Sequence, residues 1–403
     1  MKIDLYFWPI KIQAWILSWG LLSAIKSCGA LNKCGNTASW ANPSLIPSLL
    51  DTNADVIFIV GPEHFVGQID TTKIKHNKAK IACWVYESIT DPYGFNAFRK
   101  AIPGHFLDNS KEFNNTLTLI GDDHIKFFDC MDAIFCADEV DYERFKLLGF
   151  NSFWLPFGAD TDVFNSGFTT HAISSPSSKP SMIKKAIVRY NSRYGIRSGR
   201  KILERMDLYK SLPSQDTKPR FGKISAPSTP LYNRGCFVGT ITDIRSILLK
   251  RMGIDISLYQ TPRRGEFSDP TNAAIHTAEL VKYYGSHLIS FNINSIFAGL
   301  TTRSLEVMSC GRLLFQNSCP PDRPMSQNML KNCIKYDLFT NDGVSKVREQ
   351  YRHYCSKPMD AIAMGRAARA EILNGHTLKH RVTTIIEKLS GINKEMANGI
   401  RQA

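Results

Sequence analysis

The segment 290–315 combines residue types and spacings that suit the binding of an anion. An apolar run ends at Asn292, a glycine-containing loop follows, and Thr301 or Thr302 is placed to cap a helix that stops at Gly311. Backbone N–H groups at a helix start lack partners within the helix, and the helix dipole is positive there. The pattern therefore predicts a diphosphate site over residues 299–301.

Two charged side chains of the same segment add to this predicted site. Arg303 would bring a guanidinium into the first helical turn. Glu306, four residues after Thr302, lies on the same helix face and could accept hydrogen bonds from two ribose hydroxyls. A strand, loop and helix of a Rossmann-like sheet that binds no ligand is the alternative interpretation.

A second group of candidates follows two apolar runs in the N-terminal part. Glu87 and Asp91 come after the run 81–85, and His64 follows the run 56–60. All three could face a cleft, where they would orient or deprotonate an acceptor hydroxyl. Turn or helix-start carboxylates and a solvated histidine are the alternatives. Acidic pairs at 122–123 and 160/162 fit turns and helix caps, so we predict no metal site.

Apolar runs of strand length alternate with segments of helical period, which is typical of βα units that build a mostly parallel sheet. In the first part of the chain we expect strands at 2–7, 56–60, 80–85, 133–136 and 152–155. A second series begins at Cys236 and continues with strands at 254–259, 287–292 and 312–316, and 359–389 has a helical period. Two such α/β domains would bind ligands at the carboxyl ends of their strands.

The segment 299–311 resembles the donor-site motif of GT-B glycosyltransferases, particularly the spore maturation protein group within the group 1 glycosyltransferases. The motif stands here as Gly299-Leu300, Arg303, Leu305-Glu306 and Ser309-Cys310-Gly311. Further segments agree in order: Phe237-Val-Gly239 with Arg245, the strand 254–259, residues 376–381, and 154–164 upstream. Ala298 stands where many retaining enzymes of this fold carry a glutamate, which leaves the donor-side catalytic group open.

The resemblance implies transfer of a sugar from a nucleotide-diphosphate sugar to a glycan or another hydroxyl acceptor, with retention and without metal or cofactor. It implies a donor site made of eight residues: Gly239, Arg245, Asn292, Gly299, Leu300, Thr301, Arg303 and Glu306. It also implies two Rossmann-like domains that face a central cleft. We assign an N-terminal acceptor domain to 1–164, a basic linker with a helical insert to 165–232, and the nucleotide-sugar-binding domain to 233–403.

The positive charge is concentrated in the linker. The chain has 50 basic and 36 acidic residues, and segment 165–234 alone has 14 basic and three acidic ones. We name Lys184, Lys185, Arg189 and Arg193 as candidates for binding an anionic acceptor. The alternatives are a glycosyltransferase that acts on modified bases in DNA, a solvated basic face that contacts an anionic membrane surface, and a GT-B protein that binds nucleic acid or carbohydrate without catalysis.

The ten cysteines form no Cys-x-x-Cys pair, and Cys83 and Cys136 lie inside apolar runs. We therefore expect small buried hydrophobic residues in a reducing compartment, without disulfides, and a cytoplasmic protein that contacts the membrane peripherally, if at all. Charged residues interrupt the apolar N-terminus, which predicts a first strand followed by an amphipathic helix rather than a signal peptide.

Overall fold

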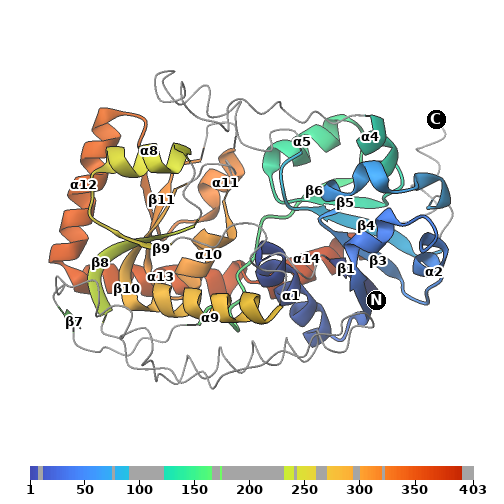
Figure 1. The fold of residues 1–403 in the computed structure, drawn as a ribbon, viewed down its shortest axis with the longest axis horizontal. Helices are drawn as coiled ribbons and strands as arrows, with labels where there is room; N and C mark the ends of the chain where they lie inside the picture. The colour runs from blue at the N-terminus through green and yellow to red at the C-terminus, as the bar shows by residue number, and fades with distance from the viewer. Residues whose placement is uncertain are drawn as a thin grey trace. The chain divides into compact units, whose positions relative to one another are not determined.

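The computed structural model describes residues 1–7, 12–74, 78–89, 122–165, 173–174, 231–239, 243–259, 270–293, 300–319 and 323–392 (Figure 1). The chain divides into two compact units, each with its own parallel sheet. Unit 1 comprises Met1–Phe95, Thr116–Gly158 and Leu378–Ala403, and unit 2 comprises Asn96–Asn115 and Ala159–Thr377. This architecture confirms the predicted α/β fold class.

Unit 1 has a sheet of six parallel strands in the order β2-β1-β3-β4-β5-β6. The strands are β1 (Ile3–Phe7), β2 (Leu31–Asn36), β3 (Val56–Val60), β4 (Lys80–Val85), β5 (Ala133–Cys136) and β6 (Ser152–Trp154). All five residues of β3 are buried, as expected for a strand covered on both faces. Strand β2 lies on one side of β1, and the next strand of the chain, β3, lies on the other side. A topological switch point therefore lies between β1 and β3.

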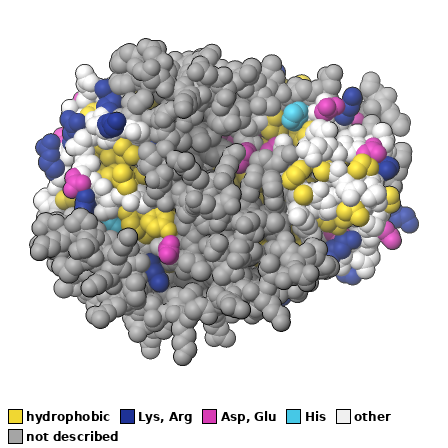
Figure 2. All heavy atoms as spheres, viewed as in Figure 1, with side chains coloured by type: hydrophobic (Ala, Val, Ile, Leu, Met, Phe, Trp, Pro, Cys, Tyr) yellow, Lys and Arg dark blue, Asp and Glu magenta, His cyan; other side chains and the backbone are white. Residues whose placement is uncertain are grey.

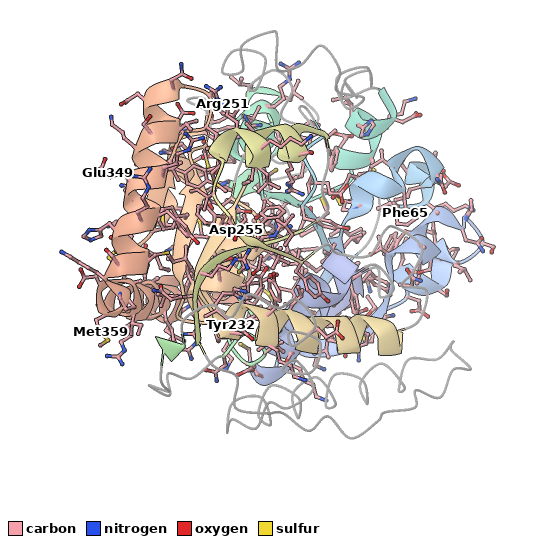
Figure 3. All side chains as sticks on the ribbon, turned by 60° about the vertical axis from the view of Figure 1, so that its left-hand side comes forward. Phe65, Tyr232, Arg251, Asp255, Glu349 and Met359 are labelled. Atoms are coloured by element: carbon pink, nitrogen blue, oxygen red, sulfur yellow. The ribbon has the colours of Figure 1, made fainter. Side chains whose placement is uncertain are left out.

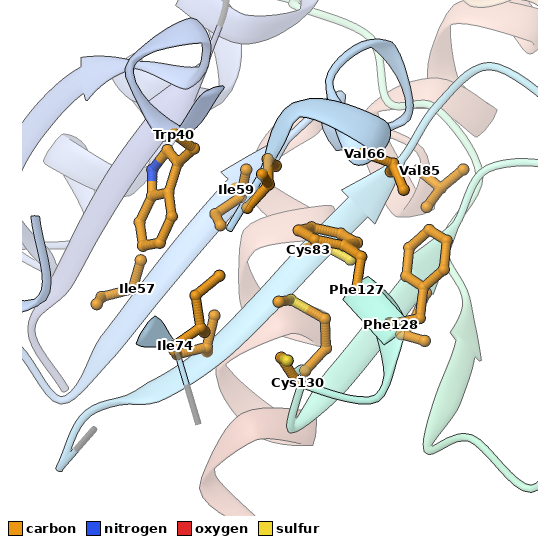
Figure 4. Close-up of a cluster of buried hydrophobic side chains, with 14 of the residues drawn as sticks. Trp40, Ile57, Ile59, Val66, Ile74, Cys83, Val85, Phe127, Phe128 and Cys130 are labelled. Carbon is orange, nitrogen blue, oxygen red and sulfur yellow. The ribbon is translucent and has the colours of Figure 1, made fainter. Parts of the chain in front are cut away.

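The helices of unit 1 are α1 (Ile12–Ser27), α2 (Ile46–Leu50), α4 (Asp122–Phe128), α5 (Glu139–Leu147) and α14 (Leu378–Ser390), with short 3-10 turns η1 (Thr37–Ala41), η2 (Pro62–His64), η3 (Val66–Gln68) and η4 (Thr71–Lys73). Figure 4 shows the hydrophobic cluster on one face of the sheet, where Trp40, Val66 and Phe127 meet the strand residues. Cys83 and Cys136 are fully buried, which confirms the prediction for these two cysteines.

The prediction of an amphipathic N-terminal helix is wrong. Four consecutive residues of α1, 19–22, are buried, so burial in this part of the helix is not confined to one face. The cause is α14, which contacts α1 although the two helices lie at opposite ends of the chain (Figure 1). No described helix combines the length and the apolar composition that crossing a membrane requires.

Unit 2 has a second parallel sheet in the order β12-β11-β10-β8-β7, and β9 also pairs with β8. The strands are β7 (Ile173–Ser174), β8 (Leu231–Val238), β9 (Ser257–Tyr259), β10 (His287–Asn292), β11 (Leu313–Asn317) and β12 (Ile334–Tyr336). The helices are α8 (Asp243–Met252), α9 (Pro270–Ser286), α10 (Thr302–Ser309), α11 (Pro324–Met329), α12 (Asn341–Ser356) and α13 (Pro358–Gly375).

The second series begins earlier than the sequence pattern predicts. Strand β8 starts at Leu231 rather than at Cys236, because its polar first half has side-chain partners in unit 2. Asn233 donates to the carbonyl oxygen of Cys355, and Arg234 forms an ion pair with Asp255 (Figure 3). The short strand β7 lies inside the predicted linker and pairs with β8.

Arginines join the helices that cover one face of this sheet. Arg251, at the end of α8, donates from Nε to the carbonyl oxygen of Leu338 at 2.7 Å (Figure 3). Arg348 of α12 donates in return to the carbonyl oxygen of Met252 at 2.7 Å and to that of Arg251 at 3.0 Å. The arginine therefore satisfies carbonyl groups that the end of a helix leaves without intrahelical partners.

On the other side of the sheet, α13 packs tightly against the turn that ends α10. A Cβ atom added at Gly365 would lie 2.9 Å from the carbonyl carbon of Gly311 and 3.1 Å from that of Arg312. Gly311 itself has φ +66°, the left-handed conformation with which helices commonly end. Glycine at 365 therefore sets how closely α13 approaches the end of α10.

We predict that Gly365→Ala lowers the free energy of unfolding by about 1 to 3 kcal/mol, because an overpacked contact against backbone forces a shift. Gly375→Ala on the same helix is the matched control, since a Cβ added there has nothing within 4 Å. The control should be neutral or slightly stabilising. Denaturant unfolding of both variants is the measurement, and equal effects would contradict the close-packing argument.

Candidate functional site

The start of α10 lies just beyond the carboxyl end of β10, as the sequence predicts. Thr301 is the N-cap residue, with φ −95° and ψ 161°, and the helix ends at Ser309 before Gly311. The Thr301 side chain does not cap the helix and instead lies 3.5 Å from Asn292 Oδ1. The positive end of the α10 dipole is thus placed at the edge of the sheet where parallel α/β folds bind ligands.

Two guanidinium groups share one aromatic ring at this edge. Arg245 of α8 and Arg303 of α10 place Cζ at 5.6 Å and 5.5 Å from the ring centroid of Phe237 in β8. We call Arg245, Phe237 and Arg303 the arginine bracket. Its charges come from two different helices, and the ring comes from the strand next to β10.

Neutral oxygens anchor the bracket. Arg245 donates from Nε to the carbonyl oxygen of Ile293 at 3.0 Å, and Arg303 donates from Nη1 to Asn292 Oδ1 at 3.1 Å. Within the described part of the chain, no carboxylate lies within 4.0 Å of the Arg303 guanidinium. Because an amide oxygen carries no formal charge, the contact with Asn292 holds the Arg303 guanidinium without neutralising it, which leaves positive charge for an anionic ligand.

Gly239 gives Arg303 its place at the end of β8. The residue has φ +147°, and an added Cβ would lie 2.7 Å from Arg303 Nη2 and 3.3 Å from Phe237 Cζ. Its N–H donates to the carbonyl oxygen of Tyr259 at 3.0 Å, which ties it to β9. Any other residue at this position would displace the guanidinium and strain the backbone.

A buried polar network fixes the orientation of Asn292. Its Nδ2 donates to Ser304 Oγ at 2.9 Å and to Gln316 Oε1 at 3.1 Å, and Ser304 Oγ donates to Gln316 Oε1 at 2.6 Å. With the amide nitrogen committed to Ser304 and Gln316, Oδ1 faces Arg303. The network therefore links β10, β11 and α10 below the bracket and decides which amide atom Arg303 meets.

Glu306 is a buried carboxyl group next to the bracket. Only 5% of the residue is exposed, and Oε2 accepts a hydrogen bond from the Tyr284 hydroxyl at 3.3 Å. Burial raises the pKa of Glu306 to about 7, against the lowering influence of the Arg303 charge and of hydrogen bonds from Thr302 and Tyr284. At neutral pH the carboxyl is therefore poised between its two protonation states, and a ligand that donates hydrogen bonds would favour the ionised one.

The structure brings together seven of the eight predicted donor-site residues, all in unit 2: Gly239, Arg245, Asn292, Leu300, Thr301, Arg303 and Glu306. Gly299 lies outside the described residues. The sheet order places β8 and β10 side by side, with β9 and β11 on opposite sides of the pair, so the site lies at a topological switch point of unit 2. The sequence did not single out Phe237 as an anchor for arginines, although it lies in one of the segments that carried the resemblance.

Of the acid/base candidates, Glu87 lies just past β4, where its N–H donates to Glu63 Oε1 at 2.9 Å. Asp91 lies outside the described residues, and for His64 the backbone alone is described, as the last residue of η2. Lys184, Lys185, Arg189 and Arg193 also lie outside the described residues. The roles of these residues stay predictions.

Glu63 is a carboxyl that sequence reasoning missed. It follows β3 through the turn Gly61-Pro62, and its Oε1 also accepts from the N–H of Tyr86 at 3.2 Å. Burial raises the pKa of Glu63 to about 8, with the nearby charge of Glu87 acting in the same direction and backbone N–H groups opposing it. The sequence carries a signal for it, because Glu63, like Glu87, is a carboxyl residue that comes shortly after a fully apolar run.

Neither unit shows a metal site in its described part: no group of three His, Cys, Asp or Glu residues is arranged to hold an ion there. Asp122 and Asp138 instead lie at the starts of α4 and α5, and Asp138 caps its helix through the N–H of Val140 at 2.9 Å. The described cysteines are all free thiols.

Comparison with known proteins agrees with this geometry. Residues 245–387 match the family described as Glycosyl transferase-like. Over this segment the chain is similar to glycosyltransferases. The match includes Arg245, Arg303 and Glu306, and it ends within α14. No curated protein matches the sequence.

Solved structures show the same GT-B fold. The chain is similar to a UDP-forming α,α-trehalose-phosphate synthase from Burkholderia vietnamiensis, with 8% identity, 97% of each chain covered and a TM-score of 0.52. It is also similar to a sucrose-phosphate synthase from Thermosynechococcus elongatus, with 10% identity, 98% and 100% coverage and a TM-score of 0.51. A glycosyltransferase from Rickettsia africae gives 11% identity, 98% and 99% coverage and a TM-score of 0.50. The predicted fold and enzyme class are confirmed, and the closer likeness to the spore maturation group stays a prediction.

We predict that Glu306→Gln weakens binding of a nucleoside diphosphate about 10- to 100-fold, the size expected when charge-assisted hydrogen bonds are lost. Affinity of the unmodified protein should rise with pH through about 7, because the ionised carboxylate accepts ribose hydroxyls, whereas the variant should lack this rise. Calorimetric titration at several pH values measures both effects, and the titration of the ligand's own phosphates cancels between the two proteins.

Unfolding at pH 8 provides the control for this variant. The folded carboxyl keeps its proton up to about pH 7, whereas the unfolded one releases it near 4.3, so the unmodified protein loses stability as pH rises through that window. Glutamine carries no charge to bury, so the variant should be at least as stable at pH 8. Unchanged affinity and pH dependence would remove Glu306 from the ligand site.

Proposed function

We propose that this protein is a glycosyltransferase that moves a sugar from a nucleotide-diphosphate sugar to a hydroxyl group of a glycan, with retention of the anomeric configuration and without a divalent metal ion. The observation that carries the proposal is the arginine bracket at the start of α10. Its two guanidiniums are held by neutral oxygens at the switch point of the unit 2 sheet, in a site that supplies positive charge from both side chains and helix dipole.

The reaction needs this positive charge when the nucleoside diphosphate leaves the sugar. The bond between the anomeric carbon and the β-phosphate oxygen breaks, the anomeric carbon bonds to the acceptor oxygen, and the acceptor proton leaves with the diphosphate or with a carboxylate. Negative charge grows on the diphosphate as the sugar departs, so groups fixed beside it lower the barrier. Two guanidiniums and a helix start can perform the charge stabilisation that a metal ion performs in other phosphate sites.

Glu306 supports a nucleoside rather than a simple diphosphate as the donor. A carboxyl group has more acceptor positions than the hydrogen bonds from Tyr284 and Thr302 use, so Glu306 can also accept ribose hydroxyls. One of the similar structures is described as UDP-forming, which makes UDP-sugars the first donors to try. The acceptor-side groups we propose are Glu87, together with Asp91 and His64, and the Glu63 carboxyl fixed beside Glu87.

We predict that Arg303→Ala lowers turnover of the preferred UDP-sugar about 10²- to 10³-fold, the usual cost of removing one donor that stabilises developing charge. Arg245→Ala should impair turnover similarly, and Arg303→Lys should recover only part of the rate, because an ammonium lacks the planar fork. Arg352→Ala, which changes an exposed arginine of α12, is the control. Full rate of Arg303→Ala at saturating donor would refute the leaving-group role.

A chelator should leave the rate unchanged, and loss of activity on chelation would show that a metal ion takes part. Release of nucleoside diphosphate from the sugar donor without any acceptor separates an enzyme from a binding protein. If no UDP-, GDP- or ADP-sugar is hydrolysed or transferred, the non-catalytic alternative holds.

The acceptor is proposed from charge. The segment 165–234 carries a net charge of +11, whereas basic and acidic side chains are interspersed over the described part of the face in Figure 2. We propose that this segment binds an anionic glycan or a glycan at an anionic membrane. DNA with a modified base is the second candidate, favoured by Tyr190 and Tyr194 between the basic residues.

We predict that reversing the charges of Lys184, Lys185, Arg189 and Arg193 spares hydrolysis of the donor but weakens transfer to the acceptor. If the acceptor is DNA, binding to duplex should fall with salt by about −0.9 on a log-log plot for each phosphate neutralised. Duplex binding no stronger than binding to a neutral polymer at low salt would exclude DNA. Equal loss of hydrolysis and transfer would place the segment at the donor instead.

A further inference from the structure

Two carboxyl groups from different elements of unit 1 hold the part of the chain directly after β4. The first belongs to Glu63, whose Oε1 accepts from the N–H groups of Tyr86 and Glu87 at 3.2 and 2.9 Å. The carboxyl reaches them because the turn after β3 lies against the end of β4, where the N–H of Gly61 donates to the carbonyl oxygen of Trp84 at 3.0 Å. One carboxyl oxygen therefore contacts two successive backbone N–H groups.

The second carboxyl group belongs to Asp141, in the first turn of α5. Its Oδ1 accepts from the Ser88 hydroxyl at 3.3 Å, and its Oδ2 accepts from the N–H of Ile89 at 2.9 Å. Only 1% of Asp141 is exposed, and a carboxylate in the first turn of a helix is stabilised by the positive end of the helix dipole. We call Glu63 and Asp141 the carboxyl clamp, because together they hold residues 86–89.

The clamp presents one side chain at the edge of the sheet. Tyr86, Ser88 and Ile89 are buried, whereas Glu87 is partly exposed. Strands β3 and β4 are neighbours, and the topological switch point of unit 1 lies beside β3. Parallel α/β folds bind ligands at the carboxyl ends of strands at such a point. Within residues 86–89, Glu87 is therefore the side chain that a ligand at this edge can reach.

We propose that Glu87 is the residue of unit 1 that accepts a hydrogen bond from the acceptor hydroxyl, and that Glu63 is a positioning residue that acts through it. The inference rests on the proposed function and singles out one of the acid/base candidates that the sequence offers. Hydrogen bonds hold the backbone on both sides of Glu87, so its carboxylate moves only by rotation about its own side-chain bonds. Fixing a group in this way raises the fraction of bound hydroxyls that have reactive geometry.

The protonation state of Glu63 suits a positioning role. Burial of the carboxyl raises its pKa to about 8, so at neutral pH it keeps its proton while Oε1 accepts the two N–H groups. A neutral Glu63 places no second negative charge beside Glu87. Glutamine has nearly the same shape, no charge and the same type of oxygen acceptor, so Glu63→Gln can keep both backbone contacts.

The test uses hydrolysis of whichever UDP-, GDP- or ADP-sugar the unmodified protein cleaves fastest, because water then takes the place of the acceptor hydroxyl. We expect Glu87→Ala to lower kcat about 10²-fold and Glu63→Ala about 10-fold, whereas Glu63→Gln should keep most of the rate. The KM for the sugar donor should change less than about 3-fold, since the residues of the proposed donor site lie in unit 2.

Asp132→Ala is the matched control. Asp132 is also buried, and its Oδ2 accepts from the N–H of Ile81 at 2.8 Å, near the opposite end of β4. Removing this carboxyl should lower stability but leave kcat unchanged, because the end of the strand that it holds carries no proposed site residue.

A second comparison separates positioning of Glu87 from general support of the fold. In a Glu87→Ala background, adding Glu63→Ala should lower kcat by less than about 2-fold, because no carboxylate is left to position. Amide hydrogen exchange at Tyr86 and Glu87 should become faster in Glu63→Ala and stay slow in Glu63→Gln. Thermal unfolding identifies a variant that has lost its fold.

Full kcat in a folded Glu63→Ala variant would overturn the proposal, as would losses that add up in the double variant or an equal loss in Glu63→Gln. Full kcat in Glu87→Ala would overturn the assignment of Glu87 itself. All these outcomes leave the proposed function intact, because the unmodified protein still cleaves the donor. If the unmodified protein cleaves no nucleotide sugar, the proposed function fails and the acceptor role of Glu87 fails with it.

Discussion

Two cationic side chains that approach one aromatic ring are the constraint on which the candidate site of unit 2 depends. Arg245 and Arg303 approach the same ring, and both take their anchors from neutral oxygens that follow or end β10. Carboxylate partners would have made the arrangement more stable and would have cancelled the charge that a phosphate needs. The cost is met by the buried network around Asn292, which spans β10, β11 and α10 and leaves a single orientation for the amide.

Burial gives the same edge of the sheet a second property. Glu306 lies close enough to Arg303 to be stabilised as an anion, yet desolvation outweighs that attraction and raises its pKa to about 7. The balance would be lost if Arg303 moved to form an ion pair with the carboxylate. In the proposed function, the Arg303 guanidinium over the Phe237 ring serves the phosphate and the Glu306 carboxyl serves the sugar of the nucleoside. The position of the Arg303 guanidinium therefore affects the pKa of Glu306.

The sequence predicts most of the sheet because buried parallel strands are continuous apolar runs: β3, β4 and β10 begin and end as expected. It misses β2, whose residues Asn32, Lys33 and Asn36 are polar because the strand is only partly covered at the sheet edge, and β12, which has three residues. The ends of α10 are predictable from Thr301 and Gly311, since capping is local. The arginine bracket and Glu63 are not, because each joins residues that only strand order brings together.

The course of the chain explains why the sequence alone could not give the C-terminal boundary of unit 2. The sequence predicts one helical segment over 359–389, but the structure has two helices, α13 and α14, with His376 and Thr377 between them. At this interruption the N–H of Ala159 donates to the carbonyl oxygen of His376 at 2.8 Å. Beyond this point Lys80 donates to the carbonyl oxygen of Leu389, so α14 is a structural part of unit 1. The glycosyl transferase-like match runs through this break to residue 387. The family pattern therefore includes the return of the chain to unit 1, and a fragment that ended with unit 2 would lack the helix that packs against α1.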